Sequence, residues 1–148
     1  MNKEFKDSII EMNKLYGLPI NDKPTDLGVD RLKNFKKILT EEIQEMDEII
    51  KKYENIKNSE MSEEEKLEIL TAISDVFGDI VVYVRSEALK YGIDLEEVLK
   101  IIMQSNFSKM GADGKPIYDE RGKVTKGPNY WKPEPKIKDM LKSKLELK

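Results

Sequence analysis

The chain contains no cysteine and no histidine among its 148 residues. It can therefore form no disulfide bond, and it lacks the usual protein ligands of zinc and other transition metals. Cysteine nucleophiles, Ser-His-Asp relays and histidine bases are excluded as well. Any catalysis must use carboxylates, Lys, Arg, Tyr, Ser or Thr, and carboxylate oxygens favour a hard ion such as Mg²⁺ or Mn²⁺.

Long apolar runs are also absent from the sequence. No segment has the features of a signal peptide or of a membrane span, so we expect a cytoplasmic protein with no membrane partner. A chain of 148 residues most simply forms one domain, and it is long enough to bury a core.

The charges are unevenly distributed along the chain. Residues 1–105 hold 15 basic and 23 acidic side chains, a net charge of −8, whereas residues 106–138 hold eight basic and four acidic side chains, a net charge of +4. A segment that reverses the sign of its parent domain is a candidate binder of anions. The acidic total argues against a nucleic-acid partner.

Apolar residues recur at helical spacing in four segments, 3–16, 30–53, 63–91 and 94–108. Gly17 and Gly92 follow the first and third of these segments, and Ser62 with Glu65 forms a capping box that opens the third. A second such box, at Asp94, opens the fourth. Short connections between four helices predict an all-α fold, an antiparallel bundle of four main helices.

The composition changes at Gly111. Two turn sequences, 112–115 and 119–122, adjoin short segments at 116–118 and 123–125 that could pair as a small hairpin. The proline-rich stretch 127–135 cannot be helical, and a short last helix is expected over 136–145. Two aromatic residues within that stretch are expected to pin it to the core. We divide the chain into a helical domain, residues 1–110, and a basic extension of it, residues 111–148.

Glu42 occupies the position where the apolar stripe of the second predicted helix should continue. The third predicted helix is apolar on every side near its middle, yet it carries Asp75 and Asp79 one turn apart. Neither Glu42 nor Asp79 has a Lys or Arg one helical turn away. Buried carboxylates are normally paired, protonated or bound to metal, so the two helices predict one shared divalent ion. Glu41 and Glu48, by contrast, are more typical of a solvated face.

The string Glu41-Glu42-x-x-Glu45, followed about thirty residues later by a Gly-Asp-aliphatic helix, resembles the MazG-like all-α nucleoside triphosphate pyrophosphohydrolases. The upstream segment 16–19, with Pro24 and Arg31 beyond it, is similar to the phosphoribosyl-ATP-pyrophosphohydrolase-like subgroup. The similarity extends over roughly residues 5–110.

The resemblance implies that Glu42, Glu45 and Asp79 bind Mg²⁺, and that Glu41 is a further ligand or helps to activate water. One departure concerns the second family motif, Glu-x-x-Asp, because its Glu position is Val76 in this chain. Asp75, one residue earlier, is our candidate for the fourth metal ligand.

The implied reaction is the hydrolysis of a nucleoside triphosphate, which could be a dNTP, to a nucleoside monophosphate and pyrophosphate in the control of nucleotide pools. The resemblance also implies a homodimer or a higher homo-oligomer. Asn106 and Lys109, in a segment that also fits the family, are expected to contact substrate. Lys126 is expected to do so as part of a basic lid over the metal.

The sequence is also compatible with several alternatives. Lys109 could simply stabilise the C-terminal end of its helix, and the basic segment could be a solvated tail or a dimer-clasping arm. Phosphoribosyl-ATP is another possible substrate. The protein could also be a non-catalytic interaction or regulatory module that keeps a degenerate metal site. Ferritin-like oxidation is disfavoured because its Glu-x-x-His pairs are absent.

Overall fold

The computed structural model describes residues 3–56 and 60–146, and these fold into five α-helices. The helices are α1 (Lys3–Leu15), α2 (Val29–Asn55), α3 (Glu63–Tyr91), α4 (Leu95–Phe107) and α5 (Glu134–Lys144). The predicted all-α class is therefore confirmed, and each helix begins and ends within two residues of its predicted bounds. None of the described helices is long and apolar enough to cross a membrane.

The ends of α3 have the chemistry that the sequence indicated. Ser62 Oγ accepts a hydrogen bond from the Glu65 amide, and Glu65 Oε1 accepts one from the Ser62 amide, both at 3.1 Å, which completes a capping box. Gly92 ends the helix in the left-handed conformation, with φ 66°. A Cβ atom at Gly92 would collide with the Lys23 carbonyl of the loop before α2. This contact is a second reason, besides the backbone conformation, why position 92 requires glycine.

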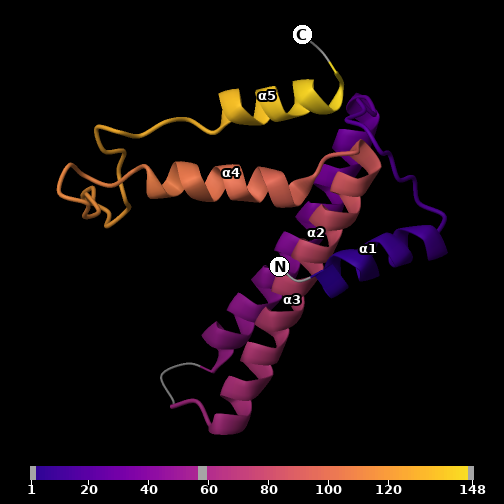
Figure 1. Ribbon diagram of the computed structural model, residues 1–148. Coiled ribbons are helices and arrows are strands. Elements are labelled where there is room, and N and C mark those ends of the chain that lie inside the picture. The colour runs from indigo at the N-terminus through magenta and orange to yellow at the C-terminus, as the bar shows by residue number, and fades with distance from the viewer. Residues whose placement is uncertain (1–2, 57–59, 147–148) are drawn as a thin grey trace.

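Helices α2 and α3 form a long antiparallel hairpin (Figure 1). Its core is the cluster of Ile49, Ile69 and Val76, and Met46 and Ile73 pack against that cluster. The cluster lies in the half of the hairpin that contains the α2–α3 connection. The two helices of the hairpin are thus held together by apolar side chains that pack between them.

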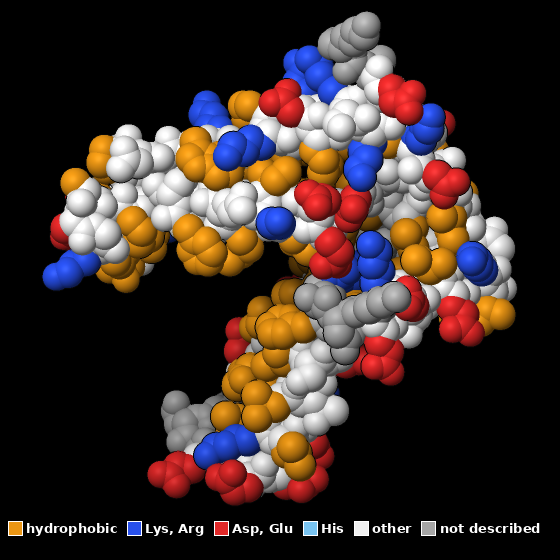
Figure 2. Space-filling model, in the orientation of Figure 1, with side chains coloured by type: hydrophobic (Ala, Val, Ile, Leu, Met, Phe, Trp, Pro, Cys, Tyr) orange, Lys and Arg blue, Asp and Glu red, His pale blue; other side chains and the backbone are white. Residues whose placement is uncertain are grey.

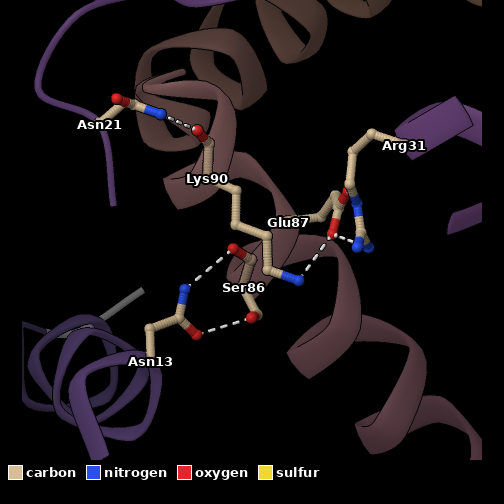
Figure 3. A network of polar contacts seen from close by, with 6 residues as sticks. All are labelled: Asn13, Asn21, Arg31, Ser86, Glu87 and Lys90. Carbon is tan, nitrogen blue, oxygen red and sulfur yellow. Dashed lines mark hydrogen bonds and ion pairs between the residues drawn. The ribbon is translucent and has the colours of Figure 1, made fainter. Parts of the chain in front are cut away.

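A network of polar side chains holds α1 and the start of α2 against the last turns of α3 (Figure 3). Asn13 is fully buried; its amide donates to the Ser86 carbonyl at 3.1 Å, and its Oδ1 accepts from Ser86 Oγ at 2.6 Å. Arg31 makes a two-pronged contact with the Glu87 carboxylate, at 2.6 and 2.8 Å. Lys90 adds a third donor to that carboxylate, at 3.0 Å. The buried charge of Glu87 is therefore fully paired.

Helices α4 and α5 lie side by side and project from one end of the hairpin (Figure 1). We call residues 95–146 the arm. Asp94 caps α4 by accepting from the Glu97 amide at 3.4 Å, which is one half of the predicted box. Ser105 Oγ donates to the Trp131 carbonyl at 2.9 Å, and Ser108 Oγ accepts from the Trp131 amide at 3.2 Å. The aromatic segment is thus pinned to α4.

The turn-rich segment contains the small hairpin that the sequence suggested. Tyr118 and Val124 form an isolated antiparallel bridge, and it is flanked by a hydrogen bond of 2.7 Å from the Thr125 amide to the Ile117 carbonyl. No longer ladder occurs among the described residues. The pairing is therefore limited to the immediate neighbourhood of the turn at 119–122.

Candidate metal centre

Three carboxylates meet across the seam between α2 and α3. Each of Glu42, Glu45 and Asp79 offers an oxygen, and these oxygens lie within 4.8 Å of one another. Helical spacing explains the grouping, because Glu45 lies one turn after Glu42 on α2 and both face the side of α3 that carries Asp79. Three carboxylates at this separation repel one another unless a cation or a proton lies between them.

Glu42 is the most deeply placed member of the group, with 7% of its surface exposed. Its Oε2 atom is buried and has no hydrogen-bond partner among the described residues. Burial raises the pKa of this carboxyl, and the neighbouring charges of Glu45, Asp79 and Asp75 raise it further. A hard divalent cation fits this donor set, because carboxylate oxygens are its preferred ligands and it would satisfy the orphaned atom.

Asp75 and Glu41 lie at the edge of the group. Both side chains are exposed, and neither contributes to the set of oxygens within 4.8 Å. Asp75 is nevertheless close enough for its charge to raise the pKa of Glu42. The structure therefore places Asp75 beside the three central carboxylates rather than among them.

Val76 occupies the position that the family motif assigns to Glu. Only 3% of this residue is exposed, and it packs with Ile49 and Ile69 in the hairpin core. A carboxylate at the same backbone position would face that apolar cluster. This chain thus has a buried apolar residue at the position where the family that it resembles has an acidic one.

Tyr83 lies close enough to the acidic group to interact with its charges, and the sequence pattern did not indicate it. Its pKa is raised by burial and then by the charges of Glu42, Asp79 and Glu45, so its hydroxyl senses the whole group. It lies one helical turn after Asp79, and 39% of its surface stays exposed. That spacing is the signal that could have identified it, but Tyr83 is embedded in a run of apolar residues and was counted with them.

The residues predicted to contact substrate are not brought to the acidic group within one chain. Asn106 lies in the last turn of α4, which points away from the hairpin, and Lys109 follows two residues after that helix ends (Figure 1). The Lys109 carbonyl accepts a hydrogen bond from the Gly127 amide at 2.7 Å, and the Lys126 ammonium lies 5.1 Å from the centroid of the Tyr130 ring. These contacts hold the Lys109 backbone and the Lys126 side chain within the arm.

Comparison with known proteins relates the chain to other proteins by fold. No protein-family model matches it, and no curated protein matches it significantly. Among solved structures it is similar to the crystal structure of a "putative NTP pyrophosphohydrolase" from Exiguobacterium sp. 255-15, with a TM-score of 0.52 and 20% sequence identity. The match covers 95% of this chain and 96% of the other. The two proteins therefore share an all-helical fold.

Proposed function

We propose that the protein hydrolyses a nucleoside triphosphate to a nucleoside monophosphate and pyrophosphate, with Mg²⁺ or Mn²⁺ bound by Glu42, Glu45 and Asp79. The proposal depends chiefly on one observation: Glu42 is buried with an unpartnered Oε2 atom, and one oxygen from each of Glu42, Glu45 and Asp79 lies within 4.8 Å of the others. The fold shared with the Exiguobacterium structure supports the same class of reaction. A dNTP is included among the proposed substrates.

The side chains of the site have distinct roles in this proposal. A bound ion would neutralise charge on the phosphate oxygens and hold a water near the phosphorus. Glu41, whose side chain is exposed, would accept a proton from that water. Tyr83 would donate its hydroxyl hydrogen to a phosphate oxygen, because burial, and after it the charges of Glu42 and Asp79, raise its pKa and keep it protonated. The oxygen of that water would bond to a phosphorus on one side of the bridge between the α- and β-phosphates, as the bond from that phosphorus to the bridging oxygen breaks. The bridging oxygen would stay with the other phosphate group, and the monophosphate and pyrophosphate would then leave.

The arm is proposed to act on a second copy of the chain. Hydrophobic side chains gather on the underside of the arm and on the hairpin face turned to the same hollow (Figure 2). The exposed apolar residues of α3 and α4 include Leu70, Phe77, Val81, Met103 and Phe107. Burial of these residues, together with the opposite charges of arm and hairpin, favours a homodimer or a higher homo-oligomer. In that assembly Asn106, Lys109 and Lys126 of one copy would meet the phosphates held by the other.

The remaining assignments are proposals of the same kind. Residues 1–110 would form the catalytic domain, with residues 111–148 as its basic extension, and the protein would act in the cytoplasm without nucleic acid or membrane. The buried Val76 favours one second candidate, a non-catalytic module with a degenerate metal site, since the fourth family carboxylate is absent at that position. Phosphoribosyl-ATP belongs in the substrate panel because of the subgroup that the sequence resembles.

Product analysis tests the reaction. The full chain is incubated with Mg²⁺ and a panel of nucleoside triphosphates, dNTPs and phosphoribosyl-ATP, and the products are separated by chromatography. We expect equal amounts of monophosphate and pyrophosphate from at least one substrate. Diphosphate with orthophosphate, or full activity in excess chelator, would overturn the assignment. Binding of Mg²⁺ and nucleotide without turnover would identify the non-catalytic module instead.

A further inference from the structure

A cavity of about 420 Å³ lies at the junction of α1, the loop at 20–24, the end of α3 and the two helices of the arm. Arg85, in its wall, follows Asp79 by six residues, which places it about two-thirds of a turn around α3. None of the carboxylates of the candidate metal centre lines the cavity. It is therefore a separate feature of the molecule.

Much of the cavity wall is apolar. The apolar lining includes Ile9, Ile10, Ile20, Leu89, Met140 and Leu141, which come from α1, the loop, α3 and α5. The volume lies in the range of about 300–1,000 Å³ that is typical of sites for small molecules. The wall thus suits an apolar body of modest size.

Arg85 is the unusual polar residue of this wall. Only 6% of it is exposed, and its guanidinium carbon lies 5.3 Å from the centroid of the Phe5 ring. Its Nη1 pairs with Glu96, but Nε and Nη2 are buried and have no hydrogen-bond partner among the described residues. A guanidinium carries five N–H donors, and burying them without acceptors is unfavourable. An additional anionic acceptor would remove that cost.

The other charges at the cavity also favour an anion. Lys6, Lys14 and Lys144 line it together with Arg85. Three acidic residues, Asp22, Asp94 and Glu96, line it as well, so the four basic side chains leave a net charge of +1. Asp94 caps α4 and Glu96 is paired with Arg85, so these two charges are partly engaged. The three lysines, by contrast, form no ion pair with a described residue, so their charges are available to an anion.

We propose that this cavity binds a small organic anion with an apolar body, of which a medium-chain carboxylate is the simplest example. The apolar part lies among the Ile, Leu and Met side chains, and the carboxylate accepts hydrogen bonds from Arg85 in competition with Glu96. The cavity touches α3 and both helices of the arm, so occupancy ties the arm to the hairpin. The binding itself does not depend on the proposed hydrolysis.

Calorimetric titration of the full chain with decanoate, without metal or nucleotide, tests the proposal. We expect saturable binding at one site, and decanol, which has the same tail without the charge, binds at least about tenfold more weakly. Arg85→Met combined with Glu96→Gln removes both charges of the ion pair and lowers decanoate affinity by a similar factor. Glu96→Gln alone raises the affinity, because it removes the competing carboxylate.

Three outcomes overturn the site. They are the absence of saturable binding, equal affinity for acid and alcohol, and unchanged affinity in the double variant. If the double variant does not fold by circular dichroism, Leu141→Trp decides the question. This change fills the cavity from α5 while leaving Arg85 in place, so it must abolish binding, and wild-type affinity in it contradicts the proposal.

Discussion

At the scale of single residues, Glu42 combines two opposed properties. Its carboxylate is buried and its Oε2 atom has no hydrogen-bond partner among the described residues, which is unfavourable for the metal-free protein, and the same placement makes it a strong candidate ligand for a cation. Asn13, which is fully buried as well, has both polar atoms of its side chain paired with Ser86. Glu42 Oε2, by contrast, is buried without such a partner among the described residues.

Glu42→Gln is expected to remove nearly all turnover and yet to stabilise the metal-free protein near neutral pH. The amide keeps the shape of the side chain and removes the charge, and relief of a buried charge is worth on the order of 1 kcal/mol, or about 3 °C in melting temperature. Thermal melts with and without Mg²⁺ measure both effects. Mg²⁺ should raise the melting temperature of the parent and change that of the variant far less.

The pH dependence of the same comparison follows from the raised pKa of Glu42. Folding disfavours the charged form of Glu42, so its ionisation destabilises the folded protein. This loss of stability is complete above the pKa that Glu42 has in the folded protein, and it disappears as the pH falls below the pKa that it has in the unfolded chain. The advantage of Glu42→Gln without metal should therefore shrink on acidification. Glu48→Gln, at an exposed position outside the group, is the control and should be close to neutral. Equal Mg²⁺-induced shifts in parent and Glu42→Gln would remove Glu42 from the site.

Asp75→Asn is expected to weaken metal dependence without abolishing activity. Asp75 lies beside the central carboxylates and acts on Glu42 through its charge, so its loss should shift the Mg²⁺ titration to higher concentration. Activity measured against Mg²⁺ concentration gives the result. Glu45→Gln is the comparison and should shift the titration further, because Glu45 belongs to the set within 4.8 Å. An unchanged titration would assign Asp75 a purely structural role.

At the scale of elements, the turn at 119–122 depends on one carboxylate. Asp119 Oδ1 accepts from the amides of Arg121 and Lys123, both at 2.9 Å. The Lys123 amide is the main cause of the lowered pKa of Asp119, and the Arg121 amide adds to it. The small hairpin of the arm therefore depends on the ionised form of Asp119.

Acidification is expected to loosen this hairpin. Since the pKa of Asp119 is lowered by folding, its contribution is present above the unfolded value of about 3.9 and is lost as the pH falls through the folded value. The amide signal of Lys123 in nuclear magnetic resonance spectra should report the change. Asp119→Ala should loosen the hairpin even at neutral pH, whereas Asp113→Ala, in the preceding turn, should leave it intact. A Lys123 signal unaffected by Asp119→Ala would contradict this account.

At the scale of the whole molecule, the acidic group and the basic arm are separated within one chain (Figure 1). Lys109→Ala should lower catalytic efficiency for triphosphates, and Lys126→Ala should do the same. Both effects should diminish at high salt, because ions screen the contact with phosphate. Neither change should affect folding, since surface substitutions usually cost less than about 0.5 kcal/mol. Wild-type kinetics in both variants at low ionic strength would exclude the arm from substrate binding.

Mixing two defective variants tests whether the arm serves a second copy. Glu42→Gln has a defective acidic group and an intact arm, whereas Lys109→Ala has an intact acidic group and a defective arm. In a mixed dimer the acidic group of the Lys109→Ala copy meets the arm of the Glu42→Gln copy, so one of the two sites has both parts intact. Random pairing should restore about a quarter of wild-type activity. Activity no higher than the average of the separate variants would contradict the arrangement, and a mixture of Glu42→Gln with Asp79→Asn is the control that should stay inactive.

Local chemistry explains how far the fold could be predicted. The bounds of α3 followed from a capping box at Ser62 and a left-handed glycine at position 92, both of which act within a few residues. The grouping of Glu42 with Asp79 followed from helical periodicity and could be anticipated. The role of these residues in metal binding stays a prediction.

Long-range pairing could not be read from the sequence. Arg31 pairs with Glu87, 56 positions away, and only the packed hairpin brings them together. The sequence predicted an antiparallel bundle of four main helices, and the direction in which α4 and α5 project from the hairpin could not be read from the spacing of apolar residues. Tyr83 could not be distinguished in the sequence from the apolar residues on either side of it.

The buried contact between Asn13 and Ser86 has a consequence for synthesis on the ribosome. The two residues are 73 positions apart, so α1 emerges long before its partner on α3 exists. The α2–α3 hairpin can form from contacts that are closer in sequence, and contacts of large sequence separation form slowly. Docking of α1 is therefore expected as a late event, and Ile9, buried in the final structure, stays exposed in the nascent chain until then.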